Sequence, residues 1–320
     1  MSTDTDELRI KGRSTTVEAS TVQGKRIFST GRWLRRAVVK DEDWVESAVV
    51  VDFPAFCHQL KASGLKADVL QMPARLGDPS AMPGVQIEVD NAAVIGTADF
   101  KGWWEALPQE ARKSARRAHK RGVTIVDAVL DDDFARGIQA IYDETPIRQS
   151  RRFWHYGKDL ATVKRENQTY AERAHFIGAY FEGRLIGFMK WVYVDDSARI
   201  MQILCMNAHQ DKRPIIALIV KAAESCHLHG SKYLIYGKYH YGTKTDSSIT
   251  EFKRRLGFEQ LDFVRYHVPL TWRGRLALRL GVAQDIKSLL PKWLLDAFRE
   301  TRSRWLRPNT NLASAPSVKP

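Results

Sequence analysis

The chain has 320 residues, of which 44% are hydrophobic, so it can bury one large core or two modest ones. Its 50 Lys and Arg residues outnumber 37 Asp and Glu residues, giving a formal net charge of +13 and a pI of about 9.7. This balance favours phosphate-bearing or anionic-membrane partners over cationic ones. No stretch approaches the roughly 20 apolar residues that span a bilayer, which predicts a soluble or peripheral protein.

The cysteine spacing and the first residues indicate the compartment. Cys57, Cys205 and Cys226 are far apart, lack the C-x-x-C spacing of a zinc site and leave one cysteine unpaired. We therefore expect no metal and a cytoplasmic location, with binding at the inner face of the cell membrane as the alternative. Residues 1–24 are polar and lack the apolar core of a signal peptide, so we expect a flexible tail.

Residues 25–100 are predicted to form a smaller, strand-rich N-terminal subdomain. Short apolar runs at 48–51, 67–71 and 85–89 are separated by prolines and a glycine, a pattern that favours strands and turns over long helices. The punctuating residues are Pro54, Pro73, Gly77, Pro79 and Pro83. The sequence leaves open whether this region folds independently.

A different pattern begins near residue 103. Residues 103–121 (WWEALPQEARKSARRAHKR) predict one basic helix, and residues 124–130 predict a strand. Acidic N-capping residues then begin a helix over 131–146, and residues 159–173 predict a second, polar helix. The connection between these two helices is rich in arginines and aromatic residues.

Three antiparallel strands are predicted at 175–181, 185–194 and 199–206, because the turns between them are short. Pro214 suits the first turn of a buried helix that ends near Gly230, and residues 232–236 predict another strand. A crossover through this helix makes the strands at 199–206 and 232–236 parallel neighbours.

A capped helix and a last strand complete the pattern. Ser248 and Glu251 predict a capping box for a helix that ends at Gly257, and residues 258–268 have strand character. The order β, α, α, β, β, β, α, β, α, β, with the phrase EFKRRLGFEQLDFVRYHVPL at 251–270, resembles the GNAT acyltransferase fold. The segment RKSARRAHKRGVTIV at 112–126 resembles the FemAB-like branch of that fold, associated with peptidoglycan and exopolysaccharide.

The resemblance implies an α/β (α+β) fold with a mixed, mostly antiparallel sheet flanked by helices over residues 101–270. A basic amphipathic helical segment over 271–307 follows, with Leu, Trp and Phe among Arg and Lys. From Trp272 onward such helices either lie on an anionic membrane or dock on their own domain, and both alternatives stay open. The composition of residues 308–320 predicts a disordered tail.

The resemblance also implies a donor site. In GNAT enzymes the acyl-CoA pyrophosphate lies at the start of the central helix, after a Gln or Arg and two glycines. Gln210 matches the first position, whereas Asp211, Arg213 and Ile215 stand where small residues are expected. Either Lys212 and Arg213 hold an anion by side-chain charge, which suits an aminoacyl-tRNA donor, or they form a solvated turn. The candidate donor-binding residues are Met206, Asn207, Gln210, Lys212, Arg213 and Pro214.

The loop at 142–157 would face the acceptor in the GNAT arrangement. Asp143 or Glu144 then acts as a general base, and Arg148 or Arg152 binds an anionic sugar or phosphate. The alternative for these residues is ordinary surface ion pairing, and for His155 it is packing beside aromatic neighbours. The candidate acceptor-binding residues are Arg148, Arg152, Trp154, His155, Lys190 and Gln202.

Tyrosines beyond the strand at 232–236 are candidates for a second catalytic role. In GNAT enzymes a tyrosine there protonates the departing thiolate, and Tyr239 or Tyr241 occupies that position, with plain aromatic packing as the alternative. Cys205 is not favoured as a nucleophile, because no His or Asp is placed near it in sequence.

The function predicted from these features is transfer of an acyl or aminoacyl group. The donor is acetyl-CoA or another acyl-CoA, or aminoacyl-tRNA, and the acceptor is an amine or hydroxyl of a bacterial cell-envelope glycan or its lipid-linked precursor. A non-catalytic GNAT-like scaffold and a nucleic-acid-binding protein are the alternatives, the latter because of the +13 charge. The sequence does not predict the oligomeric state.

Overall fold

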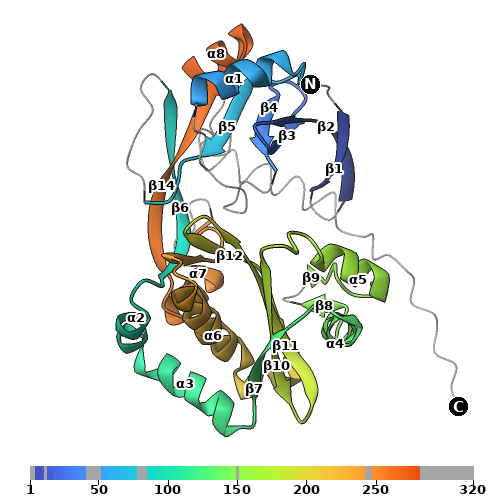
Figure 1. Cartoon of the computed structure of the whole chain (residues 1–320), viewed down its shortest axis with the longest axis vertical. Coiled ribbons are helices and arrows are strands. Elements are labelled where there is room, and N and C mark those ends of the chain that lie inside the picture. Colours follow the sequence, from blue (N-terminus) through green and yellow to red (C-terminus); the bar gives the residue numbers. More distant parts are fainter. Residues whose placement is uncertain are drawn as a thin grey trace, which may run out of the picture.

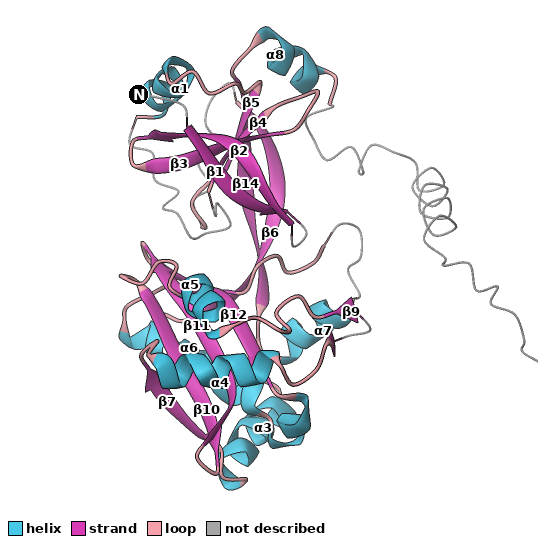
Figure 2. Cartoon of the chain, turned by 90° about the vertical axis from the view of Figure 1, so that its right-hand side faces the viewer, coloured by secondary structure: helices cyan, strands magenta, loops and turns pink. Residues whose placement is uncertain are grey.

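The computed structural model describes residues 4–10, 13–40, 52–77, 85–148, 151–241 and 247–281. Within these residues, twelve strands form one sheet in the order β1-β2-β3-β4-β5-β14-β6-β13-β12-β11-β10-β7, and β8 and β9 form a separate hairpin. The molecule has two lobes that are joined by the long strands β6 (Gln86–Gly96) and β14 (Glu259–Pro269), as Figure 1 and Figure 2 show.

The C-terminal lobe follows the predicted GNAT-like order, which confirms the fold class. Its elements are α2 (Phe100–Ala106), α3 (Gln109–Lys120), β7 (Thr124–Ala128), α4 (Asp132–Tyr142), β8 (Ile147–Arg148), β9 (Arg151–Arg152), α5 (Leu160–Asn167), β10 (Ala174–Phe181), β11 (Arg184–Val194), β12 (Ser197–Cys205), the 3-10 helix η1 (Asn207–Lys212), α6 (Pro214–Leu228), β13 (Tyr233–Ile235) and α7 (Ser248–Arg255). The strands β12 and β13 are parallel, with α6 as the crossover between them.

Two cores lie on opposite faces of this lobe's sheet. Because successive strand residues point to opposite faces, Met189 packs on the side of α3 and α6 while its neighbour Phe188 packs on the side of α4 and α5. Figure 1 shows this arrangement, with α6 on one side of β10–β12 and α4 on the other. The helix α6 is apolar nearly all round, and most of its side chains are buried, as its composition predicts.

The N-terminal lobe repeats part of the same topology. It contains β1 (Asp4–Ile10), β2 (Arg13–Val22), β3 (Lys25–Thr30), β4 (Arg36–Val39), α1 (Phe53–Ala62), β5 (Val69–Pro73) and α8 (Trp272–Arg279). The strands β2, β3 and β4 are antiparallel, and β4 is parallel to β5. The C-terminal lobe has the same arrangement, in which β10, β11 and β12 are antiparallel and β13 is parallel to β12. The helix α1, which connects β4 to β5, therefore corresponds to α6, which connects β12 to β13.

The two lobes exchange strands at their junction. The strand β6, which precedes the C-terminal lobe in the chain, pairs with β13, and β14, which follows it, pairs with β5 of the N-terminal lobe. Across the β6–β14 pair, the buried Arg265 donates to the Asp90 carboxylate at 3.2 Å, and Lys238 lies 2.7 Å from the same carboxylate. Neither lobe's part of the sheet is complete without a strand from the other end of the chain.

Several sequence expectations for the N-terminal lobe are corrected by the structure. The predicted flexible tail over 1–24 is wrong for β1 and β2, because both strands find antiparallel partners that satisfy their backbone groups. The expectation of few helices missed α1. Pro54 lies in the first turn of that helix, where a proline is tolerated, and Asp52 caps it.

Helix boundaries in the C-terminal lobe also differ from the predictions. The single helix expected over 103–121 is two helices, since Pro108 lies between α2 and α3 and removes a backbone donor. The expected helix over 159–173 ends at Asn167. The capping residue of α7 is Ser247, not Ser248, and Glu251 pairs with Arg254 and Arg255.

Some predictions fall outside the described residues, namely the strand at 48–51 and the segment from 282 to 320. Of the predicted C-terminal amphipathic stretch, α8 is described. No described helix is both long and apolar enough to cross a membrane.

The exchange of strands predicts that the two lobes unfold together. Phe263 of β14 is buried among Leu76, Val94 and Ile235, which come from both sides of the junction. Phe263→Ala should lower the free energy of unfolding by about 3–5 kcal/mol. Chemical denaturation followed by both fluorescence and circular dichroism should still give one coincident transition.

The matched control for this prediction is Val129→Ala, which truncates an exposed apolar side chain and should change stability by less than about 0.5 kcal/mol. Two separate transitions in the Phe263→Ala protein would contradict the shared junction.

Candidate functional site

The parallel strands β12 and β13 part in the middle of the sheet. They pair at Ser197 with Tyr233, at Ala198 with Leu234 and at Arg199 with Ile235, and there β13 ends while β12 continues to Cys205. We call this parting the seam. A cavity of about 1390 Å³ lies beside it, lined by the end of β12, the start of α6, one face of α3, one face of α7 and the β8–β9 hairpin.

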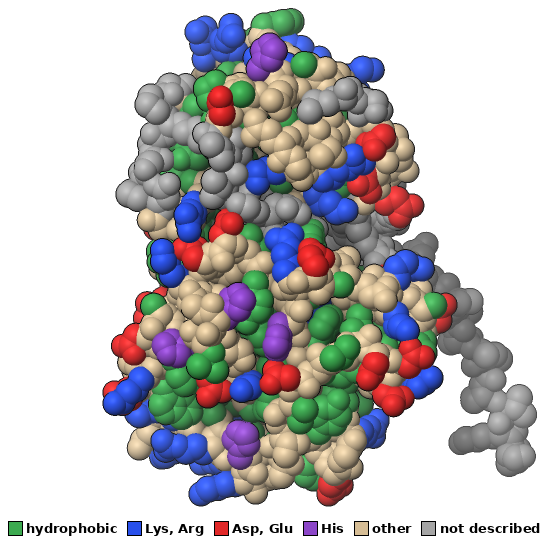
Figure 3. Space-filling model, viewed as in Figure 1, with side chains coloured by type: hydrophobic (Ala, Val, Ile, Leu, Met, Phe, Trp, Pro, Cys, Tyr) green, Lys and Arg blue, Asp and Glu red, His purple; other side chains and the backbone are tan. Residues whose placement is uncertain are grey.

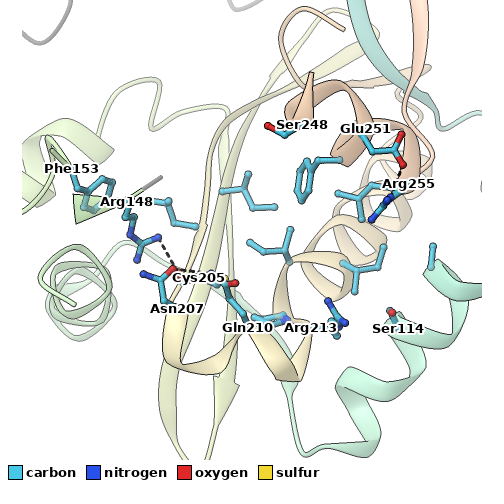
Figure 4. A pocket seen from close by; sticks show the side chains of 18 of the residues that line it. Ser114, Arg148, Phe153, Cys205, Asn207, Gln210, Arg213, Ser248, Glu251 and Arg255 are labelled. Carbon is cyan, nitrogen blue, oxygen red and sulfur yellow. Dashed lines mark hydrogen bonds and ion pairs between the residues drawn. The ribbon is translucent and has the colours of Figure 1, made fainter. Parts of the chain in front are cut away.

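The cavity lining combines apolar side chains with charged side chains, which we call its rim. Ile203, Ile215 and Phe252 are among the apolar ones. In Figure 4, Arg148 lies on one side with Phe153, Glu251 and Arg255 lie opposite on α7, and Arg213 faces Ser114 of α3. The charged lining residues are Arg148, Arg151, Arg152, Arg213, Arg255, Glu110 and Glu251. Since Glu110 pairs with Arg117 and Glu251 with Arg254 and Arg255, the rim suits an anionic ligand.

The start of α6 is arranged to receive an anion. Arg213 precedes the helix in the left-handed conformation, with φ of +59°, and its side chain makes no capping hydrogen bond. Pro214, the first residue of α6, has no backbone N–H, and the N–H groups of the next residues lack intrahelical acceptors. With the helix dipole, these donors favour a negative group at the cavity wall.

Glu144 holds the start of η1 in place. Its carboxylate accepts the backbone N–H of Asn207 at 2.7 Å and that of Ala208 at 2.9 Å, and it accepts from Arg148 at 3.1 Å. Arg148 in turn donates to the Cys205 carbonyl at 3.0 Å. Glu144 therefore fixes the connection from β12 to α6, and both of its oxygens are already hydrogen-bonded.

A buried polar network lies behind the β8–β9 hairpin. The Tyr142 hydroxyl donates to Gln202 at 2.9 Å, Gln202 lies 3.2 Å from His155 Nε2, and Lys158 lies 3.2 Å from His155 Nδ1. Burial raises the pKa of Tyr142 to about 12. Lys190 is also buried, and its ammonium donates to the carbonyls of Asn167 and Thr169 at 2.8 and 2.7 Å. This network supports the wall that carries Trp154.

Similar folds have been solved, although no protein-family model and no curated protein matches the sequence. FemX superposes with a TM-score of 0.57 at 9% identity, covering 82% of this chain and 88% of FemX. The C-terminal domain of a putative lysylphosphatidylglycerol synthetase from Agrobacterium fabrum gives 0.51 at 14% identity, with 82% and 87% covered. L-PGS from Bacillus licheniformis gives 0.51 at 12% identity, with 83% and 87% covered.

The chain has the GNAT-like fold of FemX. The likeness extends over more than four-fifths of the chain, so it includes the N-terminal lobe as well as the predicted GNAT-like region. It therefore reaches well beyond the half of the chain in which the sequence resemblance was found.

The FemX-like fold brings one group of the predicted site residues to the cavity. These are Arg148, Arg152, Trp154, Asn207, Gln210, Arg213 and Pro214. The other predicted residues lie outside its lining, and they are Met206, Lys212, Asp143, Glu144, Tyr239, Tyr241, His155, Lys190 and Gln202. Lys212 is directed at the ring of Phe181, and Asp143 accepts the backbone N–H of Gly157 at 2.9 Å. Tyr239 packs against the core near α6, and Tyr241 is exposed. The individual roles of all these residues stay predictions.

The structure bears on Cys205 as a nucleophile and on metal binding. Burial raises the pKa of the Cys205 thiol to about 11, which makes a thiolate nucleophile unfavourable at neutral pH. Within the described ranges, no three His, Cys, Asp or Glu side chains are grouped so that they could hold a metal ion.

Lys253, the most perturbed amine near the seam, is not among the residues predicted from the sequence. Its side chain is 2% exposed and makes no ion pair with a described residue, while its ammonium donates to the Lys238 carbonyl and lies 4.9 Å from the centre of the Tyr236 ring. Desolvation, with the nearby charge of Arg199, lowers the pKa of Lys253 to about 8. Helical spacing alone gives no such signal, because lysine is normally exposed.

Two substitutions of Arg213 should affect the stability of the fold and the binding of an anion differently. A non-glycine residue in the left-handed region costs about 1–2 kcal/mol, so Arg213→Gly should raise the free energy of unfolding by about 1 kcal/mol. Arg213→Ala keeps the strain and should leave stability nearly unchanged. Because both variants lack the guanidinium, both should bind inorganic pyrophosphate more weakly, as measured by calorimetry. Equal free energies of unfolding for Arg213→Gly and Arg213→Ala would show that the left-handed backbone at this position is not strained.

Replacing Lys253 by an apolar residue should raise the free energy of unfolding by an amount that depends on pH. The pKa of Lys253 in the folded protein, about 8, lies below the ordinary lysine value of 10.5, so the unfolded chain binds more protons between these pH values and wild-type stability rises across them. Lys253→Met should therefore stabilise the protein by about 3 kcal/mol below pH 8, and this advantage should disappear above pH 10.5.

Denaturant unfolding at several pH values measures this difference. Lys221→Met removes a partly exposed lysine of α6 and serves as the control, with no expected trend over the same pH range. A pH-independent gain at Lys253 would indicate a packing effect instead.

Proposed function

We propose that the chain is an acyl- or aminoacyltransferase. It transfers the group from CoA or a tRNA-type carrier to an amine or hydroxyl of a bacterial cell-envelope glycan or its precursor. The observation that carries this proposal is the seam between β12 and β13, which adjoins a cavity with an anion-receptive helix start at one wall. A carrier with phosphate groups would place its anion at α6 and its acyl group along the seam.

The reaction requires little covalent chemistry from the protein. The acceptor nitrogen or oxygen attacks the acyl carbonyl, the bond from that carbonyl to the carrier's sulfur or oxygen breaks, and the acceptor's proton passes to the departing atom. Holding the two substrates together supplies much of the rate enhancement. Asp143 and the tyrosines remain candidates for proton transfer, whereas Glu144 would first have to release its backbone donors.

The Lys253 ammonium suits a second task in this reaction. A positive charge in a desolvated setting stabilises the negative charge that develops on the carbonyl oxygen during attack. Lys253 follows Phe252, which lines the cavity, and the charge of Arg199, the last residue of the paired part of β12, contributes to its lowered pKa. A role beside the seam would give a use to a buried amine that makes no ion pair with a described carboxylate.

An aminoacyl-tRNA donor is favoured over acyl-CoA by the side chains at the start of α6. Arg213 and Ile215 both line the cavity where the GNAT pattern has small residues, so a pyrophosphate cannot approach the backbone there as closely as glycines permit. Arginine side chains hold phosphates at a greater distance by bidentate hydrogen bonds. Acyl-CoA stays the second candidate for the donor.

A phosphate-bearing, lipid-linked acceptor fits the opposite wall. Arg148, Arg152 and Trp154 line the cavity on the β8–β9 side, where guanidinium groups and an aromatic face suit a sugar phosphate. One protein of similar fold is named a putative lysylphosphatidylglycerol synthetase, a name that describes a lysyl group joined to a phospholipid. Such an acceptor would place the enzyme in the cytoplasm or at the inner face of the membrane.

Calorimetric titration of the full-length protein tests the donor. A non-hydrolysable aminoacyl-tRNA should bind, and Arg213→Ala should weaken that binding about 10-fold or more, because a charge-assisted phosphate contact is lost. Deacylated tRNA and acetyl-CoA serve as the comparison ligands. Tighter binding of acetyl-CoA than of the tRNA would contradict the favoured donor and indicate an ordinary acyltransferase.

Two further outcomes would contradict the transferase proposal itself. Binding of neither donor would support the scaffold alternative. Equal binding of any RNA or DNA of similar length, unchanged in Arg213→Ala, would support the nucleic-acid-binding alternative.

A further inference from the structure

Large apolar side chains are exposed at the far end of the N-terminal lobe. Trp272, Leu276 and Leu280, in and just after α8, are 71%, 49% and 65% exposed. Trp33, in the loop between β3 and β4, is 86% exposed. Figure 1 shows α8 beside α1 at the end of the molecule opposite the C-terminal lobe.

The helix α8 is fixed so that its apolar stripe points outward. Gly274 and Leu278 face the lobe, Leu278 packs with Val69 and Leu34, and a Cβ on Gly274 would lie 1.9 Å from the Asp68 carbonyl oxygen. At about 100° per residue, the stripe of Trp272, Leu276 and Leu280 lies on the side of the helix opposite Gly274 and Leu278. Docking on its own lobe therefore uses one face of α8 and leaves a second apolar face to solvent.

The exposed Trp33 is tied to the same helix. Arg273 donates to the Trp33 carbonyl at 2.7 Å. Asp68 links the loop that contains Trp33 to the start of α8. Its carboxylate accepts hydrogen bonds from the Arg35 backbone N–H at 3.0 Å and from the Thr271 hydroxyl at 2.8 Å. The loop at 31–36 and the segment at 271–281 thus form one fixed surface, which we call the docking tip.

The docking tip carries positive charge without acidic residues. Neither segment contains Asp or Glu, whereas together they contain Arg32, Arg35, Arg36, Arg273, Arg275 and Arg279. Arg32, Arg275 and Arg279 make no ion pair with any described residue. Lys and Arg side chains are visible at this end of the molecule in Figure 3. On α8, Arg273 and Arg279 flank the apolar stripe on either side.

We propose that the docking tip binds the surface of an anionic lipid bilayer. Trp272, Leu276, Leu280 and Trp33 would enter the boundary between headgroups and acyl chains, and the flanking arginines would contact lipid phosphates. A bilayer fits better than a protein partner, because the stripe consists of three side chains along one side of a short helix, whereas a stable protein interface buries about 800 Å² on each partner. The inference goes beyond the proposed transfer reaction and does not depend on it.

Flotation of the full-length protein with lipid vesicles tests the proposal. The protein should bind vesicles of phosphatidylcholine with phosphatidylglycerol, bind vesicles of phosphatidylcholine alone weakly, and lose binding as salt is raised. The Trp272→Ser/Leu276→Ser/Leu280→Ser protein should lose most of its binding and keep its thermal stability, since these side chains are exposed. Leu228→Ser, an equally exposed leucine on the other lobe, is the matched control.

Charge substitutions separate the headgroup contacts from insertion. Arg275→Glu and Arg279→Glu should each weaken vesicle binding by about 5-fold or more, whereas Arg184→Glu, on the hairpin between β10 and β11, should leave it unchanged. Unaltered binding by the triple serine variant would overturn the proposal. So would a change from dimer to monomer in that variant without any vesicle binding, because the tip would then contact a second copy.

Discussion

The parting of β12 from β13 after Arg199 is the constraint on which the candidate site depends. A continuous pair of strands would satisfy its own backbone groups and leave no entry between them. Because β13 ends while β12 continues, the free end of β12 and the start of α6 line one cavity. Glu144 maintains this geometry by holding the turn that follows β12.

The C-terminal lobe was predictable because its signals are local. The apolar run after Pro214 and the hairpin turns between 174 and 205 each specify an element, and their order specifies the crossover. The N-terminal lobe was less predictable, since β1 and β2 are polar strands that depend on pairing with neighbours, and α1 contains a proline read as a turn signal. The position of Lys253 could not be read from the sequence, because its burial depends on Tyr236 and Lys238, which precede it in a separate loop.

Two residues of the site show the same conflict between stability and the proposed function. Arg213 has a backbone conformation that glycine would adopt more easily, and Lys253 is a buried amine whose pKa is lowered by desolvation. Both features destabilise the folded chain, and Arg213 lines the cavity while Lys253 lies near Arg199 at the seam. Strained and desolvated groups of this kind are common in active sites, where the surrounding structure holds them in place.

The exchange of β6 and β14 between the lobes affects how the chain folds during synthesis. The inner edge of β5 has no partner until β14 has been made, because Val69 pairs with Pro269. The lobe that leaves the ribosome first is therefore the one that completes its sheet last, and it must wait with exposed backbone donors and acceptors while the second lobe is translated. Such distant pairing slows folding and leaves an unpaired strand edge of the nascent N-terminal lobe open to non-native pairing until β14 has been made.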